Sequence, residues 1–436
     1  MLRGFFILFF IAYSMQLSVG QIQLDQVEDT VTGSKKSIEV FMIDDPPKID
    51  GVMNDPVWKT APYIDEFYQR EPNNGDPISK PTKVYICFDE KTLYIGFQCF
   101  DDPDKITAKE LLRDISLGED DRVQVILDTY LDGRNAFWFQ IGPLGSIGDA
   151  LVSDNGAGFN KQWDGIWEGK AKINDHGWDA EMAIPFKTLN FRPDKDVWGL
   201  KLIRHIKRNL ERSYWPDANL NTYGFQVSDA GLMKGMKGMS QGFGLDIQPY
   251  ALVGVERKTG EENNFKWDIG GDAFYQISSG LNAALTINTD FAQTEADDRQ
   301  INLTRFSLFF PEKRDFFLDG ANYFNFGFNT DSRNRYGQKM IPYFSRRIGL
   351  DENGNPIPII VGLKMIGQAG NWNIGALNST QKTDSSYQNF TVARVSHNIG
   401  KQSYIGMIGT KGNAIGPESN WLAGVDFKIG TDSFRG

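Results

Sequence analysis

The carboxyl-terminal half of the sequence alternates apolar and polar side chains at every second residue, in segments of about ten residues. In "LDIQPYALVGVE" (245–256), Leu245, Ile247 and Val253 alternate with polar residues or glycine. Successive side chains of a β-strand point to opposite faces, so each segment predicts a strand with one apolar and one polar face. The same alternation recurs in residues 280–291, 361–368, 372–378, 390–396, 404–410 and 420–431.

Long amphipathic strands are typical of an antiparallel transmembrane β-barrel, whose apolar side chains face lipid. The alternative is a soluble sandwich or lipocalin-like barrel with its apolar side chains turned inward, but soluble strands average only about 5 to 6 residues. We therefore predict an all-β chain with a membrane barrel in residues 243–436. About nine strands are recognisable, an odd number for a bacterial barrel, so we expect the barrel to be incomplete and the sequence to be a fragment.

The amino-terminal half has shorter strands separated by Asp, Gly, Pro and Asn, which predicts a β-sandwich over residues 38–216. A helix is a candidate for residues 107–115. Residues 217–242 are rich in glycine and methionine and have no period, so they are interpreted as a linker. The strands expected in the sandwich are 84–88, 93–100, 123–128, 136–141, 178–184 and 198–205.

Residues 1–20 have the layout of a signal peptide: Arg3, an apolar run over 5–13, and small residues at Ser18 and Gly20. A membrane anchor is the alternative, but the run is shorter than the roughly 20 residues that a spanning helix needs. We expect an exported mature protein that begins with a flexible lead over residues 21–37.

Composition narrows the choice of partners. A net charge of -10 argues against nucleic acid, whose phosphates require a basic face. Aromatic residues make up 13% of the chain, which suits either membrane girdles or sugar-stacking platforms. The two cysteines lie in a predicted hairpin that turns at residues 89–92 and pairs Ile86 with Ile95. Cys87 and Cys99 then point to opposite faces, so we expect packing residues and no disulfide.

Five segments together resemble a group of bacterial exported proteins. These proteins join a module similar to carbohydrate-binding module family 9 to an outer-membrane barrel domain of unknown function. The resemblance implies a sandwich attached to the cell outer membrane, either periplasmic or surface-exposed, and it implies no activity for the barrel. The segments are "IDGVMNDPVW" (49–58), "DDRVQVILDTYLDGRNAFWFQIGPLGSIGDALV" (120–152), "WDGIWEGKAKINDHGWDAEMAIPFKTLNF" (163–191), "INTDFAQTEADDRQINLTRFSLFFPEKRDFFLDG" (287–320) and "YFSRRIGL" (343–350).

Two tryptophan-containing segments of the sandwich are candidates for binding a sugar. Pyranose rings stack their apolar faces on flat aromatic rings, while their hydroxyls need fixed polar groups. Each tryptophan taken singly could equally be a core residue. The candidate ligand-binding residues are Trp163, Asp164, Trp167, Arg134, Asn135 and Trp138.

Carboxylates near one another in two predicted turns are candidates for a structural calcium ion, which prefers oxygen ligands in loops. Their spacing is not that of an EF-hand, and the alternative is solvated turn acids or ion pairs to nearby arginines. The candidate ligands are Asp120, Asp121, Asp128 and Asp132. No other cofactor is predicted.

Residues 306–357 have no regular alternation and are too long for an ordinary connection. We expect this segment to fold into the barrel as a plug, with its charges paired to polar wall residues such as Asn288 and Asp290. A lid on the rim is the alternative. The plug charges are Glu312, Lys313, Arg314 and Asp315.

These features predict an exported carbohydrate-binding protein of the outer membrane, with a polysaccharide or oligosaccharide and membrane lipid as partners. One alternative is an envelope glycoside hydrolase in carbohydrate catabolism, and another is a structural or transport barrel with an interaction sandwich. His176, His205 and His397 are scattered, and no H-E-x-x-H, G-x-S-x-G or phosphate-loop motif occurs. The motifs therefore favour binding over catalysis.

Overall fold

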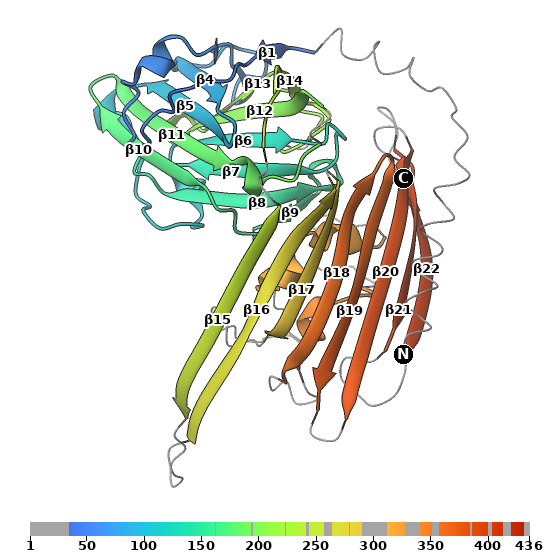
Figure 1. Ribbon diagram of the computed structural model, residues 1–436. Coiled ribbons are helices and arrows are strands. Elements are labelled where there is room, and N and C mark those ends of the chain that lie inside the picture. The colour runs from blue at the N-terminus through green and yellow to red at the C-terminus, as the bar shows by residue number, and fades with distance from the viewer. Residues whose placement is uncertain are drawn as a thin grey trace, which may run out of the picture. The chain divides into compact units, whose positions relative to one another are not determined.

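The computed structural model of the chain has two β-rich parts, an amino-terminal sandwich and a carboxyl-terminal sheet (Figure 1). The predicted signal peptide (1–20) and most of the predicted flexible lead (21–37) lie outside the described residues. None of the described helices is long and apolar enough to cross a membrane. The structure describes residues 35–161, 163–192, 195–222, 224–240, 244–256, 264–278, 280–289, 312–327, 341–350, 357–383, 386–399, 403–412 and 420–430.

The sandwich packs a five-stranded sheet against a nine-stranded one. The five-stranded sheet has the order β10 (Glu168–Asn174), β11 (Gly177–Pro185), β5 (Thr92–Phe100), β4 (Thr82–Phe88) and β2 (Tyr63–Ile64). The larger sheet follows the path β1 (Ser37–Glu39), β14 (Gly231–Lys234), β12 (Val197–Ile206), β6 (Arg122–Asp128), β7 (Ala136–Ile141), β8 (Ile147–Ser153) and β9 (Gly158–Asn160). Two further strands, β13 (Glu211–Trp215) and β3 (Tyr68–Glu71), branch from β12.

The hairpin of β4 and β5 confirms the register predicted from its alternation. Ile86 pairs with Ile95, and Cys87 pairs with Tyr94. Both cysteines are free and buried. Cys99 joins the core between the sheets, whereas Cys87 packs with Trp58 on the other face.

Alternate residues of both sheets form the core of the sandwich. Val123, Val125 and Leu127 of β6 are buried in the same cluster as Ile86 and Phe97 of the hairpin. Complete burial of an aliphatic or phenylalanine side chain contributes about 1.5–3 kcal/mol. The two-residue period therefore determines which side chains enter the core.

The interpretation of residues 217–242 as a linker is not followed by the structure. Residues Gly231–Lys234 form β14, which runs antiparallel to β12 and parallel to β1. Met233 and Met236 are buried in the core. The methionines fill space between the sheets, a role that needs no sequence period.

The helix candidate at residues 107–115 is not helical. The backbone N–H groups of Lys109 and Glu110 donate to the Asp120 carboxylate at 2.8 and 2.9 Å. Asp121 N donates to Thr107 O at 2.8 Å. These tertiary hydrogen bonds hold an extended path and replace the bonds that a helix would form, so helix propensity is overridden.

The carboxyl-terminal part is an antiparallel sheet of eight strands in sequential order. It contains β15 (Leu245–Glu256), β16 (Asn264–Ser278), β17 (Leu281–Thr289), β18 (Ile359–Ala369), β19 (Trp372–Lys382), β20 (Tyr387–Ile399), β21 (Ser403–Lys411) and β22 (Trp421–Lys428). The seven strand segments given by residue range from the sequence are all present, β16 is an addition, and the described strands number eight against about nine expected. Among the described strands, β15 and β22 each pair with one neighbour, so this part is an open sheet and barrel closure stays a prediction.

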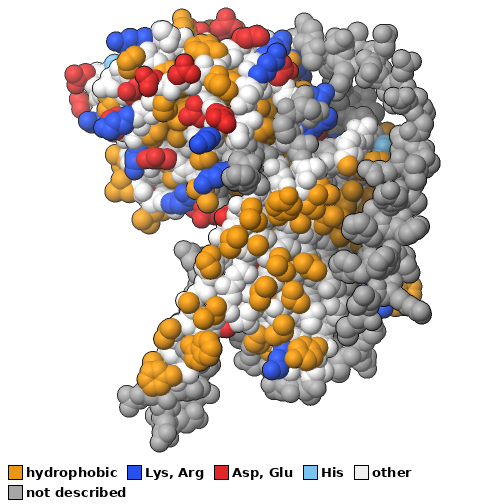
Figure 2. Space-filling model, in the orientation of Figure 1, with side chains coloured by type: hydrophobic (Ala, Val, Ile, Leu, Met, Phe, Trp, Pro, Cys, Tyr) orange, Lys and Arg blue, Asp and Glu red, His pale blue; other side chains and the backbone are white. Residues whose placement is uncertain are grey.

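The two faces of this sheet have opposite polarity. On its apolar face, side chains such as Val253 and Trp421 are 80% and 76% exposed, and apolar atoms cover the visible strands (Figure 2). The other face, called here the inner face, buries polar side chains such as Lys364, Arg394 and Asp426. Apolar residues turned to the outside do not fit the soluble alternative, in which they would face inward.

Gly51 and Gly75 offer a matched test of packing in the sandwich. Both have positive φ values, +82° and +89°, and an added Cβ would lie 2.9 Å from the Ala171 backbone carbon at Gly51 but meet nothing within 4 Å at Gly75. We expect Gly75→Ala to lower the free energy of unfolding by about 1–2 kcal/mol. Gly51→Ala should cost roughly 1–3 kcal/mol more, because of the clash. Urea denaturation measures both, and equal losses would contradict this packing.

Candidate functional site

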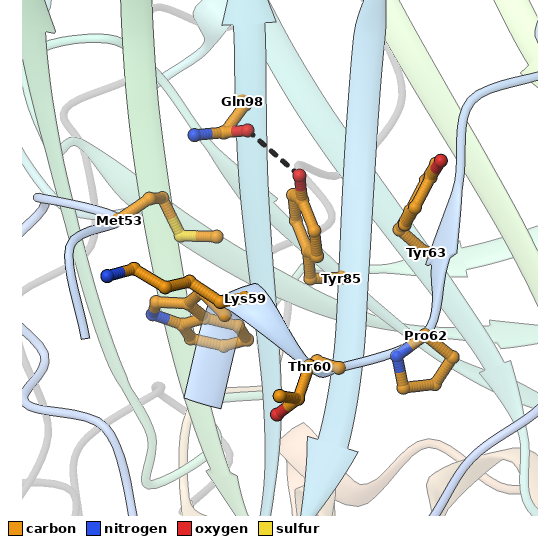
Figure 3. A pocket seen from close by; sticks show the side chains of 9 residues that line it. Met53, Lys59, Thr60, Pro62, Tyr63, Tyr85 and Gln98 are labelled. Atoms are coloured by element: carbon orange, nitrogen blue, oxygen red, sulfur yellow. Dashed lines mark hydrogen bonds between the residues drawn. The ribbon is translucent and has the colours of Figure 1, made fainter. Parts of the chain in front are cut away.

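A groove on the outer face of the five-stranded sheet is the candidate site. It has a volume of about 450 Å³. Its walls come from the segment that leads into β2, and its floor comes from β4 and β5 (Figure 3). The lining residues are Met53, Trp58, Lys59, Thr60, Ala61, Pro62, Tyr63, Tyr85 and Gln98.

A buried carboxylate on β11 holds the wall in place. Glu181 Oε2 accepts hydrogen bonds from the backbone N–H groups of Asp50 and Gly51, at 3.0 and 2.8 Å. Its Oε1 accepts from Trp58 Nε1 at 2.8 Å. A buried carboxylate needs such donors to offset its lost hydration. The segment "IDGVMNDPVW" is therefore fixed on the sheet by one side chain.

The pairing register of the strands sets the floor. Tyr63 pairs with Tyr85, and Tyr85 pairs with Gly96. An added Cβ at Gly96 would lie 2.3 Å from Met53 Cε, so this glycine makes room for the Met53 side chain. The Tyr63 and Tyr85 rings are tilted, with centroids 5.5 Å apart. The result is a small aromatic surface with Met53 at one side.

Polar groups surround these rings. Tyr85 OH donates to Gln98 Oε1 at 3.0 Å, and the Gln98 nitrogen points away from Tyr85 (Figure 3). Among the described residues, neither that nitrogen nor the Lys59 amine has a hydrogen-bond partner. Lys83 Nζ lies 5.0 Å from the Tyr63 ring centroid. Burial raises the pKa of Tyr85, and the neighbouring Tyr63 adds to this effect, so the phenol stays a neutral donor.

This set of side chains offers an aromatic surface and hydrogen-bonding groups for a ligand. Tyr63 is 50% exposed, and Lys59, Gln98 and Tyr85 supply hydrogen-bonding groups in the same groove. None of the nine lining residues is Asp, Glu, His, Cys or Ser. Hydrolysis of a glycosidic bond uses a pair of carboxyl groups, which this lining lacks.

Three of the predicted sugar-binding residues lie beside a different buried carboxylate. Trp167 is only 7% exposed and donates from Nε1 to Asp149 Oδ2 at 2.9 Å. Trp163 is half-buried against Phe137, with ring centroids 5.2 Å apart. The exposed Asp164 pairs with Arg113. Trp167 thus has no free ring face, and Trp163 has part of one.

The other three predicted residues also lie outside the groove. Trp138 is 2% exposed and packs edge-on against Phe159 and Phe225. Arg134 is buried. Asn135 Nδ2 donates to Asp132 Oδ2 at 2.8 Å within the turn after β6. The groove and these residues share no member.

The four predicted metal ligands do not form one cluster. Asp120 and Asp121 precede β6, and Asp128 and Asp132 lie at its far end, about 20 Å away for a strand of this length. Each pair accepts backbone N–H groups, as Asp121 does from Lys207 at 2.7 Å and Asp128 does from Gly133 at 2.8 Å. Within the described ranges, no three His, Cys, Asp or Glu side chains lie together in a metal-binding group.

Two of the predicted plug charges form an ion pair within the segment. Glu312 and Arg314 bind each other through two contacts of 2.8 and 2.7 Å. Asn288 Nδ2 donates to Ile269 O at 2.8 Å within the sheet. Asp290 lies outside the described residues. Pairing inside the segment is favoured because charges two residues apart need no long-range alignment.

Sequence reasoning missed every residue of the groove. Its tyrosines lie on two strands, and Met53 and Trp58 lie on an irregular segment, so no spacing in the sequence groups them. The available signals were "IDGVMNDPVW" and the outward positions of the predicted hairpin. The pairing of β2 with β4, which the sequence did not predict, is what brings this segment next to the hairpin.

Comparisons with known proteins cover the two parts separately. Residues 243–401 match the model of a domain of unknown function, DUF5916. No curated protein matches the chain. A family 9 carbohydrate-binding module from Caldicellulosiruptor kristjanssonii, solved with cellotriose, is 18% identical, with 47% of this chain and 95% of that chain covered and a TM-score of 0.35. The same organism's family 9 module solved with glucose is 16% identical, with 46% and 95% covered and a TM-score of 0.34.

Structural neighbours of about half the chain are thus family 9 modules, and the carboxyl-terminal part matches a domain without known function. The resemblance stated from the sequence is matched to this extent. The outer-membrane barrel stays a prediction.

Asp149 gives a prediction for pH. Burial raises the pKa of Asp149 to about 6, against the opposing effects of its hydrogen bonds from Trp167 and Gly165 and of Arg113. The folded state therefore holds this proton more tightly than the unfolded state, whose Asp has a pKa of about 3.9. This contribution to stability is present below pH 4 and is lost as the pH rises through about 6. The unfolding free energy of the wild type should fall relative to that of Asp149→Asn across this window, and parallel profiles would contradict the assignment.

Proposed function

We propose that the sandwich binds carbohydrate in the groove that Met53 and Gln98 help to line. The observation that carries this proposal is a half-exposed tyrosine beside donors that have no partner among the described residues, in a groove whose lining contains no carboxylate. The apolar CH face of a sugar ring would lie on Tyr63, and its hydroxyls would accept from the Gln98 nitrogen and the Lys59 amine. The C. kristjanssonii family 9 modules were solved in complex with cellotriose and with glucose.

Binding without chemistry is the better reading of this site. A glycoside hydrolase would need two carboxyl groups about 5–9.5 Å apart beside the sugar. The nearest buried carboxylate that supports the groove, Glu181, already accepts three hydrogen bonds behind Trp58. It holds the wall and does not face a ligand. The hydrolase alternative therefore has no site in this groove.

Truncation of Tyr63 tests the proposal. Isothermal titration of the full-length protein with cellotriose and a panel of neutral α- and β-linked oligosaccharides should identify a ligand. Tyr63→Ala should then weaken its binding about tenfold or more, because the stacking face is removed.

Trp163→Ala is the matched control. It removes an aromatic ring of the sandwich outside the groove, so the affinity should stay unchanged. If Trp163→Ala lost binding while Tyr63→Ala retained it, the sugar would bind near Trp163 and not in the groove. No binding to any oligosaccharide would count against the function itself.

We further propose that the carboxyl-terminal sheet is inserted in the outer membrane and tethers the sandwich there. The supporting observation is the inverted polarity of the sheet, with apolar side chains exposed and charged ones buried. Its strands run from 8 to 15 residues, and a tilted membrane strand needs about 9–11. An exposed apolar surface across eight strands is costly in water and favourable in lipid.

A charge on the apolar face tests the insertion. Val425 is exposed on this face, whereas Ser386 lies in the turn between β19 and β20. Val425→Arg should weaken folding into phospholipid vesicles by up to about 2–4 kcal/mol, while Ser386→Arg should have little effect. Vesicle flotation with protease protection measures both. A full-length protein that stays in the aqueous fraction, or equal insertion of the two variants, would contradict the proposal.

A further inference from the structure

Residues 312–327, called here the core segment, lie against the inner face of the carboxyl-terminal sheet. The segment contains a short helix α2 (Asp315–Leu318) and a 3-10 turn η9 (Ala321–Phe324), drawn in orange among the strands of Figure 1. Phe316, Phe317 and Phe324 are buried in one cluster with sheet residues such as Leu377 and Val392. The segment is therefore part of the core of this domain.

Three glycines of the sheet form sockets for phenylalanines of the core segment. An added Cβ at Gly362 of β18 would lie 2.9 Å from the Phe316 ring. The corresponding distances are 3.1 Å from Gly375 of β19 to Phe324 and 2.7 Å from Gly424 of β22 to Phe326. A side chain at any of these positions would displace its ring. Each phenylalanine ring therefore fits against a glycine that leaves space for it, and the three glycines lie on three different strands.

Polar groups of the inner face bind the backbone of the same region. Lys364 Nζ donates to Phe316 O at 2.6 Å and to Asp319 O at 2.5 Å. Asp426 Oδ2 accepts from Gly327 N at 3.0 Å, and Gln381 Oε1 accepts from Gly349 N at 2.8 Å. The buried polar groups of the sheet and the irregular backbone beside them thus satisfy one another.

The beginning of the core segment is locked to the stretch over residues 345–348. Arg314 is 1% exposed and donates from Nη1 to Ile348 O at 2.8 Å and from Nη2 to Ser345 O at 2.9 Å. Its guanidinium also lies 4.2 Å from the Phe317 ring centroid. Withdrawing the segment would expose this buried cation, Lys364 and three aromatic rings in one step. A lid that rests on the rim and opens readily would not bury these groups.

We propose that the core segment is a permanent seal of the inner face, so that the carboxyl-terminal domain is an anchor closed to solutes and not a channel. The inference is independent of the sugar groove. The anchoring role rests on the proposed membrane insertion, whereas the test of the seal reads access to the inner face and not partition into lipid.

Labelling of an engineered cysteine on the inner face tests the seal. Ser379 is buried on β19, opposite Gly362 of β18, and Ser386 is exposed in the following turn. In the full-length folded protein, a water-soluble maleimide should label Ser379→Cys at least about tenfold more slowly than Ser386→Cys, because labelling requires opening of the core. The native cysteines Cys87 and Cys99 are buried, which keeps the background low.

Two variants in the Ser379→Cys background show whether the core segment provides the protection. Replacing residues 314–327 by a Gly-Ser linker of equal length should bring labelling close to the rate of Ser386→Cys. Lys364→Met, which keeps the side-chain volume but removes the hydrogen bonds to Phe316 and Asp319, should give an intermediate rate. Circular dichroism confirms that the sheet is retained.

Equal labelling of Ser379→Cys and Ser386→Cys in the otherwise unchanged protein would overturn the seal. Unchanged slow labelling in both the linker variant and Lys364→Met would overturn the role of the segment. Slow labelling of Ser379→Cys that becomes fast in the linker variant would support the seal and count against the transport alternative.

Discussion

Every feature of this chain depends on one constraint: a strand has two faces, and each must find a suitable environment. In the sandwich, the apolar faces of two sheets meet, so residues such as Val125 and Phe97 are removed from water. The carboxyl-terminal sheet has the opposite arrangement. Its apolar side chains are exposed, and its charged ones, such as Arg394 and Asp426, are buried and bind each other through two contacts of 2.8 Å. One chain thus contains two β architectures with opposite polarity.

Irregular segments complete both architectures through buried charges. In the sandwich, Glu181 collects three N–H donors and fixes the wall of the groove. In the carboxyl-terminal part, Lys364 and Arg314 donate to backbone carbonyls of irregular segments. A buried charge is stable only when its hydrogen-bonding capacity is filled, so each of these side chains specifies the path of the segment around it. The candidate binding site and the proposed seal therefore depend on the same kind of interaction, a buried charge that binds the backbone of an irregular segment.

Much of the fold was predictable because the local alternation of apolar and polar side chains determines the strands and their faces. The β4–β5 register, the separate faces of Cys87 and Cys99, and the amphipathic strands after residue 243 follow from the two-residue period. Predictions failed where tertiary contacts outweigh local pattern. The Asp120 carboxylate holds residues 109–110 in an extended path, and core space between the sheets draws in Met233 from an apparent linker. Strand β16 escaped notice because Gly270 and Gly271 interrupt its alternation.

The sequence by itself determined the all-β class, the two parts and the face on which each strand side chain lies, because a strand imposes its period on neighbours in the chain. It also singled out tryptophans as sugar platforms, of which Trp138 and Trp167 are buried in the fold. Only the tertiary structure decided that Tyr63 meets Tyr85 under Gln98, and that phenylalanines near residue 320 fit glycines on three strands. These neighbours are distant in sequence, and their contact depends on sheet order and on buried charges that no local spacing encodes.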